Sequence, residues 1–203
     1  MSKELEKILE GTLRRLEQLL PPPPPPTDWQ ASIAFRWRKG SGHKGGGQGW
    51  LQPVRYVHRM KLSDLQGIGP QIAKVEQNTR QFLEGRPANN VLLTGARGTG
   101  KSSLVKALLN EYAAQGLRVI DLGKDALADL PDIVDLVAYR PERFILYCDD
   151  LSFSADEPGY PALKATLDGS LTMLSDNLLI YATSNRRHLM PESMHDNLAT
   201  KYV

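Results

Sequence analysis

The chain has 203 residues, of which 41% are hydrophobic, and a formal net charge of +2. This length suits one ordinary domain with an appendage, and so small a net charge by itself indicates neither a nucleic acid nor a membrane as partner. The single cysteine, Cys148, excludes an internal disulfide framework, and no apolar run approaches the roughly 18 residues of a membrane span. Because the N-terminal leucines are interrupted by charges, we expect no signal peptide and a cytoplasmic protein.

Residues 1–20 are expected to form an amphipathic helix. Its apolar residues fall on one helical stripe: Leu5, Ile8, Leu9, Leu13, Leu16 and Leu20. We interpret the segment as a helix docked on its own domain or on a second subunit, with partner recognition as the less favoured alternative. Six prolines at 21–26 then predict a stiff polyproline II segment. Its position between two structured segments favours a spacer over an SH3-type ligand.

Residues 27–61 combine basic, aromatic and glycine residues. They contain all three tryptophans of the chain: Trp29, Trp37 and Trp50. Seven Lys or Arg residues face a single acid, Asp28. Alternating polarity predicts strands over 32–38 and 50–58, joined by a glycine-rich loop. Basic residues between aromatic ones suit stacking on single-stranded nucleic acid. We favour the alternative, a small hairpin whose rings pack on the main domain while its charges are solvated.

Strands and helices alternate from residue 62 onward, in a core that we assign to residues 62–203. The predicted helices cover 70–84, 101–115, 127–140 and 161–174. The predicted strands cover 90–94, 118–122, 144–149 and 178–183. Pro131 is expected to mark a break early in the third helix. This alternation predicts an α/β fold of three layers, in which right-handed crossovers connect the strands of a parallel sheet.

A glycine-rich stretch contains the phosphate-binding pattern G-x-x-x-x-G-K-[ST] without departure. Its residues are Gly95, Ala96, Arg97, Gly98, Thr99, Gly100, Lys101, Ser102 and Ser103. The expected strand before it and helix after it are what the pattern requires. Gly95 and Gly100 permit backbone angles that let successive N–H groups point at a phosphate. We expect Lys101 to contact the β- and γ-phosphates of ATP and the Ser102 hydroxyl to bind Mg²⁺.

Polar residues at two other strand ends complete the predicted nucleotide site. The apolar strand at 144–149 ends in Asp149 and Asp150, as a Walker B segment does. We expect Asp149 to bind Mg²⁺ through water and Asp150 to act as the base for the attacking water. Related ATPases usually carry Glu at the second position; Asp is one methylene shorter, which favours slow turnover. The next strand ends at Asn185, where an amide can lie between the γ-phosphate and the water.

Asn185 fits the sensor-1 element of AAA+ ATPases, and the whole arrangement resembles that superfamily. The segment with Gly67 and Ile68, before the first core helix, looks like the stretch that lines the adenine there. More narrowly, residues about 62–197 resemble a bacterial family of predicted AAA+ ATPases catalogued as domain of unknown function 815. The matching stretches are 64–67, 78–82, 88–107, 141–153 and 180–191. The resemblance implies ATP and Mg²⁺ as ligands, and a site formed by Gly95, Gly100, Lys101, Ser102, Asp149 and Asn185.

AAA+ modules continue past sensor 1 to a fifth strand and a helical lid, which carry a finger arginine and a sensor-2 arginine. This chain stops at Val203, so we expect a truncated core without that strand and lid, which binds ATP better than it hydrolyses it. An arginine finger is worth about 10³–10⁵ in rate in comparable enzymes. We assign neither Arg186 nor Arg187 as the finger.

The expected sheet order is 1-4-3-2 for the four core strands. This order leaves the strand at 90–94 at an edge, where unpaired backbone groups invite association. The N-terminal segment at 52–58 is a candidate to cover that edge.

Two functions of different class follow from these features. The leading one is an ATPase that converts ATP and water to ADP and phosphate, and whose nucleotide state drives remodelling of a partner, usually as a homo-oligomeric ring. The alternative is a nucleotide-gated binding module that recruits nucleic acid or protein through residues 1–61 with little turnover. A small-molecule kinase fits less well, since Asn185 and the paired aspartates suit attack by water.

Overall fold

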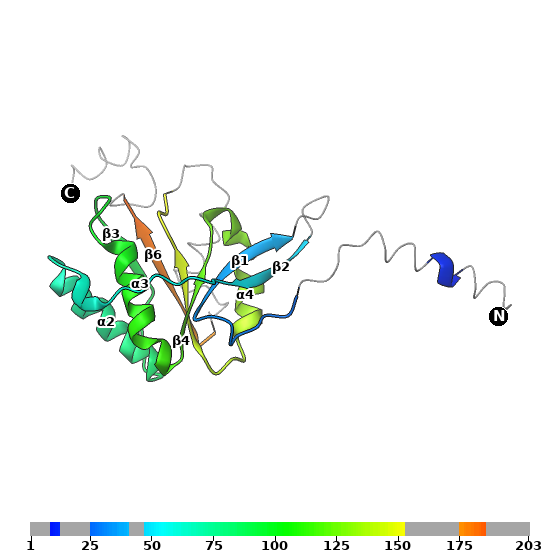
Figure 1. The fold of residues 1–203 in the computed structure, drawn as a ribbon, viewed down its shortest axis with the longest axis horizontal. Coiled ribbons are helices and arrows are strands. Elements are labelled where there is room, and N and C mark those ends of the chain that lie inside the picture. Colours follow the sequence, from blue (N-terminus) through cyan, green and yellow to red (C-terminus); the bar gives the residue numbers. More distant parts are fainter. Residues whose placement is uncertain (1–8, 13–24, 41–46, 153–174, 186–203) are drawn as a thin grey trace, which may run out of the picture.

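The computed structural model describes residues 9–12, 25–40, 47–152 and 175–185, and one six-stranded sheet organises them (Figure 1). The strands are β1 (Ala34–Gly40), β2 (Gly47–Pro53), β3 (Val91–Thr94), β4 (Leu117–Asp121), β5 (Arg143–Cys148) and β6 (Leu178–Ser184). They lie in the order β2-β1-β4-β5-β6-β3. Only the β1–β2 pair is antiparallel, and the other four pairs are parallel. The predicted α/β fold with a mostly parallel sheet is therefore confirmed.

Helices lie on both faces of this sheet. The α-helices are α2 (Gly69–Leu83), α3 (Lys101–Tyr112) and α4 (Leu130–Val137). Short 3-10 turns cover Leu62–Asp64, Ala113–Gln115 and Lys124–Asp129. In Figure 1, α2 and α3 cover one face of the sheet and α4 covers the other. None of the helices in the described ranges is long and apolar enough to cross a membrane.

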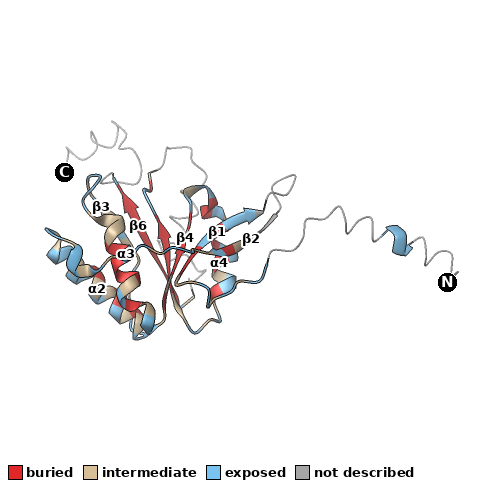
Figure 2. Ribbon diagram, viewed as in Figure 1, coloured by how far each residue is buried: buried red, intermediate tan, exposed pale blue. Residues whose placement is uncertain are grey.

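Burial on both faces explains the uninterrupted apolar runs of the central strands (Figure 2). Along β5, Phe144 and Leu146 pack toward α4, whereas Ile145 and Tyr147 pack toward α3. Every residue of β6 is buried. Parallel strands covered on both sides need apolar side chains at successive positions, because neither face meets water. The core thus consists of two apolar clusters with the sheet between them.

The sheet extends beyond the four strands that the sequence predicted. β3, β6, β5 and β4 follow one another in the predicted sequence 1-4-3-2, but β1 and β2 continue the sheet past β4, so its full order differs from the prediction. β3 pairs with β6 and, among the described residues, has no strand on its other side. The predicted boundary at residue 62 remains a prediction, although hydrogen bonds between β1 and β4 cross it.

The N-terminal hairpin joins the sheet at the opposite edge from the one expected. Ala34 pairs with Val119 and Arg36 with Asp121, so β1 covers the free edge of β4 and not that of β3. An ion pair of 2.8 Å between Arg36 and Asp121 accompanies this pairing. The expectation that residues 52–58 cover the 90–94 strand is therefore wrong.

Both hairpin strands are shifted from their predicted bounds. The second strand ends at Pro53 instead of His58. The Val54 N–H donates to the carbonyl oxygen of Ala34 at 2.9 Å, and the chain then leaves the ladder. Proline brings no N–H to a ladder, so it commonly stands where pairing ends.

The third predicted helix begins later than the periodicity indicated. Residues Lys124–Asp129 form a 3-10 turn, and the α-helix starts at Leu130 with Pro131 in its first turn. In the first turn of a helix no N–H has an acceptor within the helix, so proline loses no hydrogen bond there. Pro131 therefore begins α4 and does not break it, which corrects the prediction. The predicted helix at 161–174, the arginines after Asn185, and most of residues 1–24 lie outside the described residues.

Trp37 fixes the hairpin to the core. Its ring is 5% exposed and belongs to the same cluster as Ile133 of α4. The indole N–H donates to Asp129 at 3.0 Å. A Cβ built on Gly49, on the neighbouring strand, would lie 2.0 Å from this ring, so a side chain there would displace it. Packing is thus the role of Trp37, as favoured from the sequence, and Trp29 also packs against this cluster.

We predict that Trp37→Ala lowers the free energy of unfolding by about 3–5 kcal/mol, because it empties a filled part of the core. Urea denaturation of the full chain measures this loss. Trp50→Ala is the matched control, since Trp50 is only half-buried and should cost clearly less. A loss of less than about 1 kcal/mol for Trp37→Ala would contradict the packing role.

Candidate nucleotide-binding site

The loop between β3 and α3 has a backbone that depends on glycine. Gly95, Gly98 and Gly100 have φ angles of +148°, +84° and +86°. A residue with a Cβ resists these angles, whereas glycine adopts them readily. Gly100 is also the N-cap of α3, so the loop leads directly into that helix and turns its N-terminus toward the loop. Free N–H groups at such an end favour an anion.

A cavity of about 340 Å³ lies in front of this loop. Its lining comes from the loop and from the ends of two strands: Arg97, Gly98, Thr99, Gly100, Lys101, Ser102, Ser103, Asp149, Asp150, Thr183 and Asn185. The volume falls in the range of small-ligand sites. A larger hollow of about 750 Å³, near Arg143 and Phe82, contains none of the predicted site residues.

Lys101 is held inside the loop by three acceptors. Its Nζ lies 2.7 Å from the carbonyl oxygen of Gly95, 2.8 Å from that of Ala96 and 3.0 Å from Oδ1 of Asn185. An ammonium group has three N–H donors, so these bonds satisfy all of them. The predicted lysine and the predicted sensor amide, 84 residues apart, are therefore in direct contact.

Asp149 is the centre of a hydroxyl cluster. Its Oδ1 accepts hydrogen bonds from Ser102 at 2.8 Å, Tyr147 at 2.6 Å and Thr183 at 2.6 Å. Burial acts to raise the pKa of Asp149, but the hydrogen bonds from these hydroxyls outweigh it and lower the pKa below its ordinary value. The carboxyl group is thus kept ionised, as a ligand of a divalent cation must be.

Asp150 occupies a strained turn directly after this carboxylate. Its φ of +53° is the one positive φ of a non-glycine residue in the described part of the chain. The Asp150 N–H donates to Oγ1 of Thr183 at 2.8 Å, which holds the turn in place. Asn185 Nδ2 donates to Oδ1 of Asp150 at 2.5 Å. A chain of hydrogen bonds therefore runs from Lys101 through Asn185 to Asp150.

Two members of the cluster, Tyr147 and Thr183, were not among the predicted site residues. Burial, and then its hydrogen bond to Asp149, raises the pKa of Tyr147, so its hydroxyl remains a donor. The signal for Tyr147 was available, because a residue two positions before Asp149 on a strand shares its face. Thr183 becomes a neighbour of Asp149 only through the pairing of Cys148 with Ala182, which periodicity does not reveal.

The structure brings most of the predicted residues together, but not the predicted adenine segment. Gly95 and Ala96 contribute carbonyl oxygens to Lys101 without lining the cavity. Gly67 and Ile68 do not line it either. A Cβ at Gly100 would lie 3.3 Å from Cδ1 of Ile68, so this side chain touches the loop beside the cavity.

The described residues contain no group of three or more His, Cys, Asp or Glu side chains that could hold a metal ion. The donor set at the loop is instead one carboxylate, from Asp149, and one hydroxyl, from Ser102. This set fits Mg²⁺, which usually takes one or two carboxylates and fills its remaining positions with waters and substrate phosphates.

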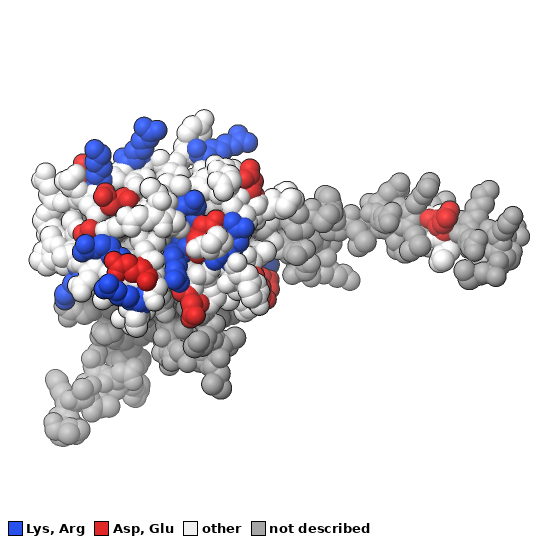
Figure 3. Space-filling view, turned by 90° about the horizontal axis from the view of Figure 1, so that it is seen from below, with Lys and Arg blue, Asp and Glu red and all other residues white. Residues whose placement is uncertain are grey.

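The cations of β1 are largely paired. Arg36 binds Asp121 at 2.8 Å, and Lys39 binds Asp129 at 2.9 Å. Arg38 donates to the side chain of Gln52. On the face that Figure 3 shows, Lys and Arg side chains lie beside Asp and Glu instead of forming one basic patch. These contacts match a hairpin that packs on the main domain while its charges are solvated.

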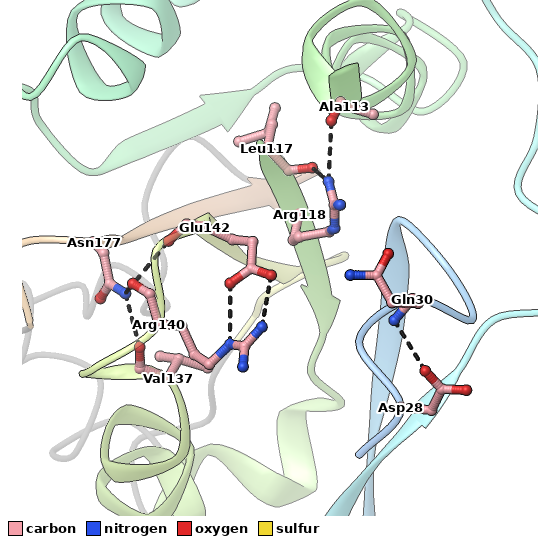
Figure 4. A network of polar contacts seen from close by, with 9 residues as sticks. All are labelled: Asp28, Gln30, Ala113, Leu117, Arg118, Val137, Arg140, Glu142 and Asn177. Carbon is pink, nitrogen blue, oxygen red and sulfur yellow. Dashed lines mark hydrogen bonds and ion pairs between the residues drawn. The ribbon is translucent and has the colours of Figure 1, made fainter. Parts of the chain in front are cut away.

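A separate polar network lies at the other end of the sheet (Figure 4). Arg140 donates to both carboxylate oxygens of Glu142, at 3.0 and 2.7 Å, which lowers the pKa of Glu142. The same guanidinium lies 4.8 Å from the ring centre of Trp29. Asn177 Nδ2 donates to the carbonyl oxygens of Val137 and Arg140, at 2.7 and 3.0 Å. These bonds connect the end of α4 to the segment before β6.

Comparison with known proteins identifies the family. The family model described as "Protein of unknown function (DUF815)" matches residues 30–202. The chain belongs to this family. The resemblance found in the sequence is confirmed, and the matched DUF815 region also includes the β1–β2 hairpin, which begins at Ala34.

A comparison with curated proteins gives no match. Among solved structures, that of PCH-2 from C. elegans is similar, with 21% sequence identity and a TM-score of 0.44. The match covers 63% of this chain and 38% of that one, so this DUF815 chain spans well under half the length of that protein.

We predict that Thr183→Val raises the pKa of Asp149, because it removes one donor from Oδ1. A carboxyl whose folded pKa is depressed contributes stability above its unfolded pKa of about 3.9 and loses it as the pH falls through the folded pKa. The stability difference between wild type and Thr183→Val should therefore narrow as the pH is lowered below about 4. Urea denaturation across this pH range measures it.

Thr79→Val is the matched control for this experiment. Its hydroxyl is also buried, but it bonds to the Val75 carbonyl oxygen and the Tyr181 hydroxyl, which do not titrate in this range. The difference between wild type and Thr79→Val should stay constant with pH. A constant difference for Thr183→Val as well would contradict the effect on Asp149.

Proposed function

We propose that this chain is the ATP-binding core of an AAA+-type ATPase that uses Mg²⁺ and couples its nucleotide state to remodelling of a partner. The observation that carries the proposal is the 2.8 Å contact between Ser102 Oγ and Asp149 Oδ1, directly behind the glycine loop. A P-loop hydroxyl and a Walker B carboxylate at this spacing are the protein groups that hold Mg²⁺ in nucleoside triphosphatases. When bound, Mg²⁺ would neutralise charge on the phosphates.

The phosphate-binding role of the loop rests on its backbone and lysine donors. The backbone N–H groups of the loop and the N-terminus of α3 favour the phosphate anion. Lys101 adds an ammonium group, whose present bonds to Gly95, Ala96 and Asn185 are all to neutral oxygens. A phosphate oxygen competes well for this group, since a hydrogen bond between two ions is stronger than one to a neutral acceptor.

Attack by water is the reaction that Asp150 and Asn185 suit. A carboxylate and an amide 2.5 Å apart can position one water, with Asp150 accepting its proton. In this structure the hydrogen bond from Asn185 occupies Oδ1 of Asp150, so this oxygen is less available to a water. That observation favours the second candidate function, a nucleotide-gated binding module with little turnover. Both candidates share the site. The binding module differs in that it recruits nucleic acid or protein through residues 1–61 and hydrolyses little ATP.

We predict that ATP with Mg²⁺ raises the melting temperature of the protein and that Lys101→Ala abolishes the rise. Binding at about one hundred times Kd stabilises the folded state by about 2.7 kcal/mol. Loss of the ammonium leaves phosphate charge uncompensated in the cavity. Lys74→Ala is the matched control, because Lys74 is an exposed lysine on α2. A thermal shift that persists in Lys101→Ala would refute the site.

We predict that Asp150→Asn retains ATP binding but lowers hydrolysis, because an amide keeps the shape and cannot accept a proton. Asp149→Asn should instead weaken the Mg²⁺ dependence of binding. Phosphate release and thermal shift, measured on both variants, separate the two roles. Wild-type turnover in Asp150→Asn would place the base elsewhere. If the wild type itself binds ATP without turnover, the binding-module function is the correct one.

A further inference from the structure

Residues 54–61, here called the strap, cross the outer side of α3 between two anchors. At one end the Val54 N–H donates to Ala34, and the Ser32 hydroxyl donates to the Val54 carbonyl oxygen at 2.8 Å. At the other end Asn110 of α3 donates to the carbonyl oxygens of His58 and Met60, at 2.7 and 3.0 Å. The strap is thus anchored at both ends, on the same face of the sheet as α3.

Two cavities flank the strap. One, of about 320 Å³, lies between the strap, α3 and the β1–β4 pair, and its aliphatic lining includes Val57, Leu109 and Val119. The other, of about 290 Å³, lies on the side of β2. Tyr56 lines both and is 93% exposed. An exposed tyrosine between two hollows is typical of an interaction surface, where Tyr is enriched.

The strap surface carries four exposed cations that form no ion pair among the described residues, although Lys106 lies near enough to Asp149 to lower the pKa of that carboxyl. They are Arg55, Arg59 and Lys61 on the strap and Lys106 on α3. This surface therefore fits a partner that offers carboxylates together with apolar side chains.

The opposite face of the molecule offers that combination. On the outer side of α4 and the turn before it, Asp125, Asp132 and Asp135 are exposed. Leu136 and Tyr139 lie among them, 43% and 98% exposed. The inner side of α4 packs in one apolar cluster, whereas the strap packs against the other, so the two surfaces lie on opposite faces of the sheet.

We propose that the strap surface of one copy binds the outer surface of α4 of a second copy. The cations of the strap would meet the aspartates of α4, while Leu136 and Tyr139 would cover the hollows beside Tyr56. A contact between two unlike surfaces of the same chain is head-to-tail, so it builds a ring or a filament and not a closed dimer. The aliphatic part of the lining of the 320 Å³ cavity suits such side chains.

The proposed contact lies beside the nucleotide cavity, because Tyr147 and Asp149 line the 320 Å³ cavity as well. If the proposed function holds, association and nucleotide binding should influence each other equally, as linkage requires. The association itself does not depend on the nucleotide. It is therefore tested in nucleotide-free protein, where failure of the ATP site has no effect on the result.

The test uses sedimentation velocity of the full chain at concentrations up to about 100 μM, at which a contact with Kd near 1 μM is saturated. The strap variant carries Arg55→Glu and Arg59→Glu, and the α4 variant carries Asp132→Lys and Asp135→Lys. We expect wild type to form oligomers and each variant alone to be monomeric. In an equimolar mixture each contact again joins opposite charges, the wild-type strap with the wild-type α4 surface and the reversed strap with the reversed α4 surface. Association should therefore return in the mixture.

Matched controls are Lys74→Glu on α2 and Glu111→Lys on α3, which reverse exposed charges outside both surfaces and should associate as wild type does. Tyr56→Ala and Tyr139→Ala should each weaken the association by about tenfold or more without affecting folding. Wild type that stays monomeric overturns the proposal, as do variants that associate normally. A mixture that stays monomeric overturns the head-to-tail arrangement, since the wild-type strap of one variant and the wild-type α4 surface of the other would then fail to bind. Tight binding of an oligodeoxythymidine probe by the strap, lost in Tyr56→Ala, would assign the surface to nucleic acid instead.

Discussion

One carboxylate oxygen connects three elements of the core. Oδ1 of Asp149 accepts hydroxyl hydrogen bonds from α3, β5 and β6, through Ser102, Tyr147 and Thr183. Hydrogen bonds from several donors stabilise the ionised form of a carboxylate. A charged oxygen also accepts stronger hydrogen bonds than a neutral one. The position of the glycine loop relative to the two strand ends therefore depends on the charge of this side chain. Ser102, which would bind Mg²⁺, and Thr183, which holds the turn at Asp150, both donate to this atom.

The sequence was most informative where chemistry depends on local spacing. The glycine loop, its lysine and serine, and the polar ends of two strands were all identified without the structure, because each is a short pattern with a defined geometry. The C-terminal ends of parallel strands meet at one edge of a sheet, so the sequence could predict that Asn185 lies near Lys101. The sequence could not predict that the two side chains form a direct hydrogen bond of 3.0 Å.

Contacts that depend on pairing between distant segments were not predictable. Periodicity identified a hairpin near Trp37 but not the strand that it would pair with, since β4 and β3 each had a free edge in the predicted four-stranded sheet. Side chains on neighbouring elements favour the β4 edge. Arg36 forms an ion pair with Asp121, and the indole N–H of Trp37 donates to Asp129. Thr183 was missed for the same reason, because only the register of β5 against β6 makes it a neighbour of Asp149. Pro131 was misread because a proline that breaks a helix and one that begins it look alike in sequence.

The β1–β4 pairing has a consequence for the order in which the molecule folds. Arg36 and Asp121, which face each other across it, are 85 residues apart in the chain. The entropy of closing this loop is lost before the contact forms, so contacts of large sequence separation form slowly. During synthesis the hairpin emerges first, and it must wait until β4 has been made before it gains its partner. In that interval the β1 edge is exposed, and an unpaired strand edge is where aggregation and exchange between chains begin. An unpaired β1 edge therefore favours association between nascent chains for as long as β4 is missing.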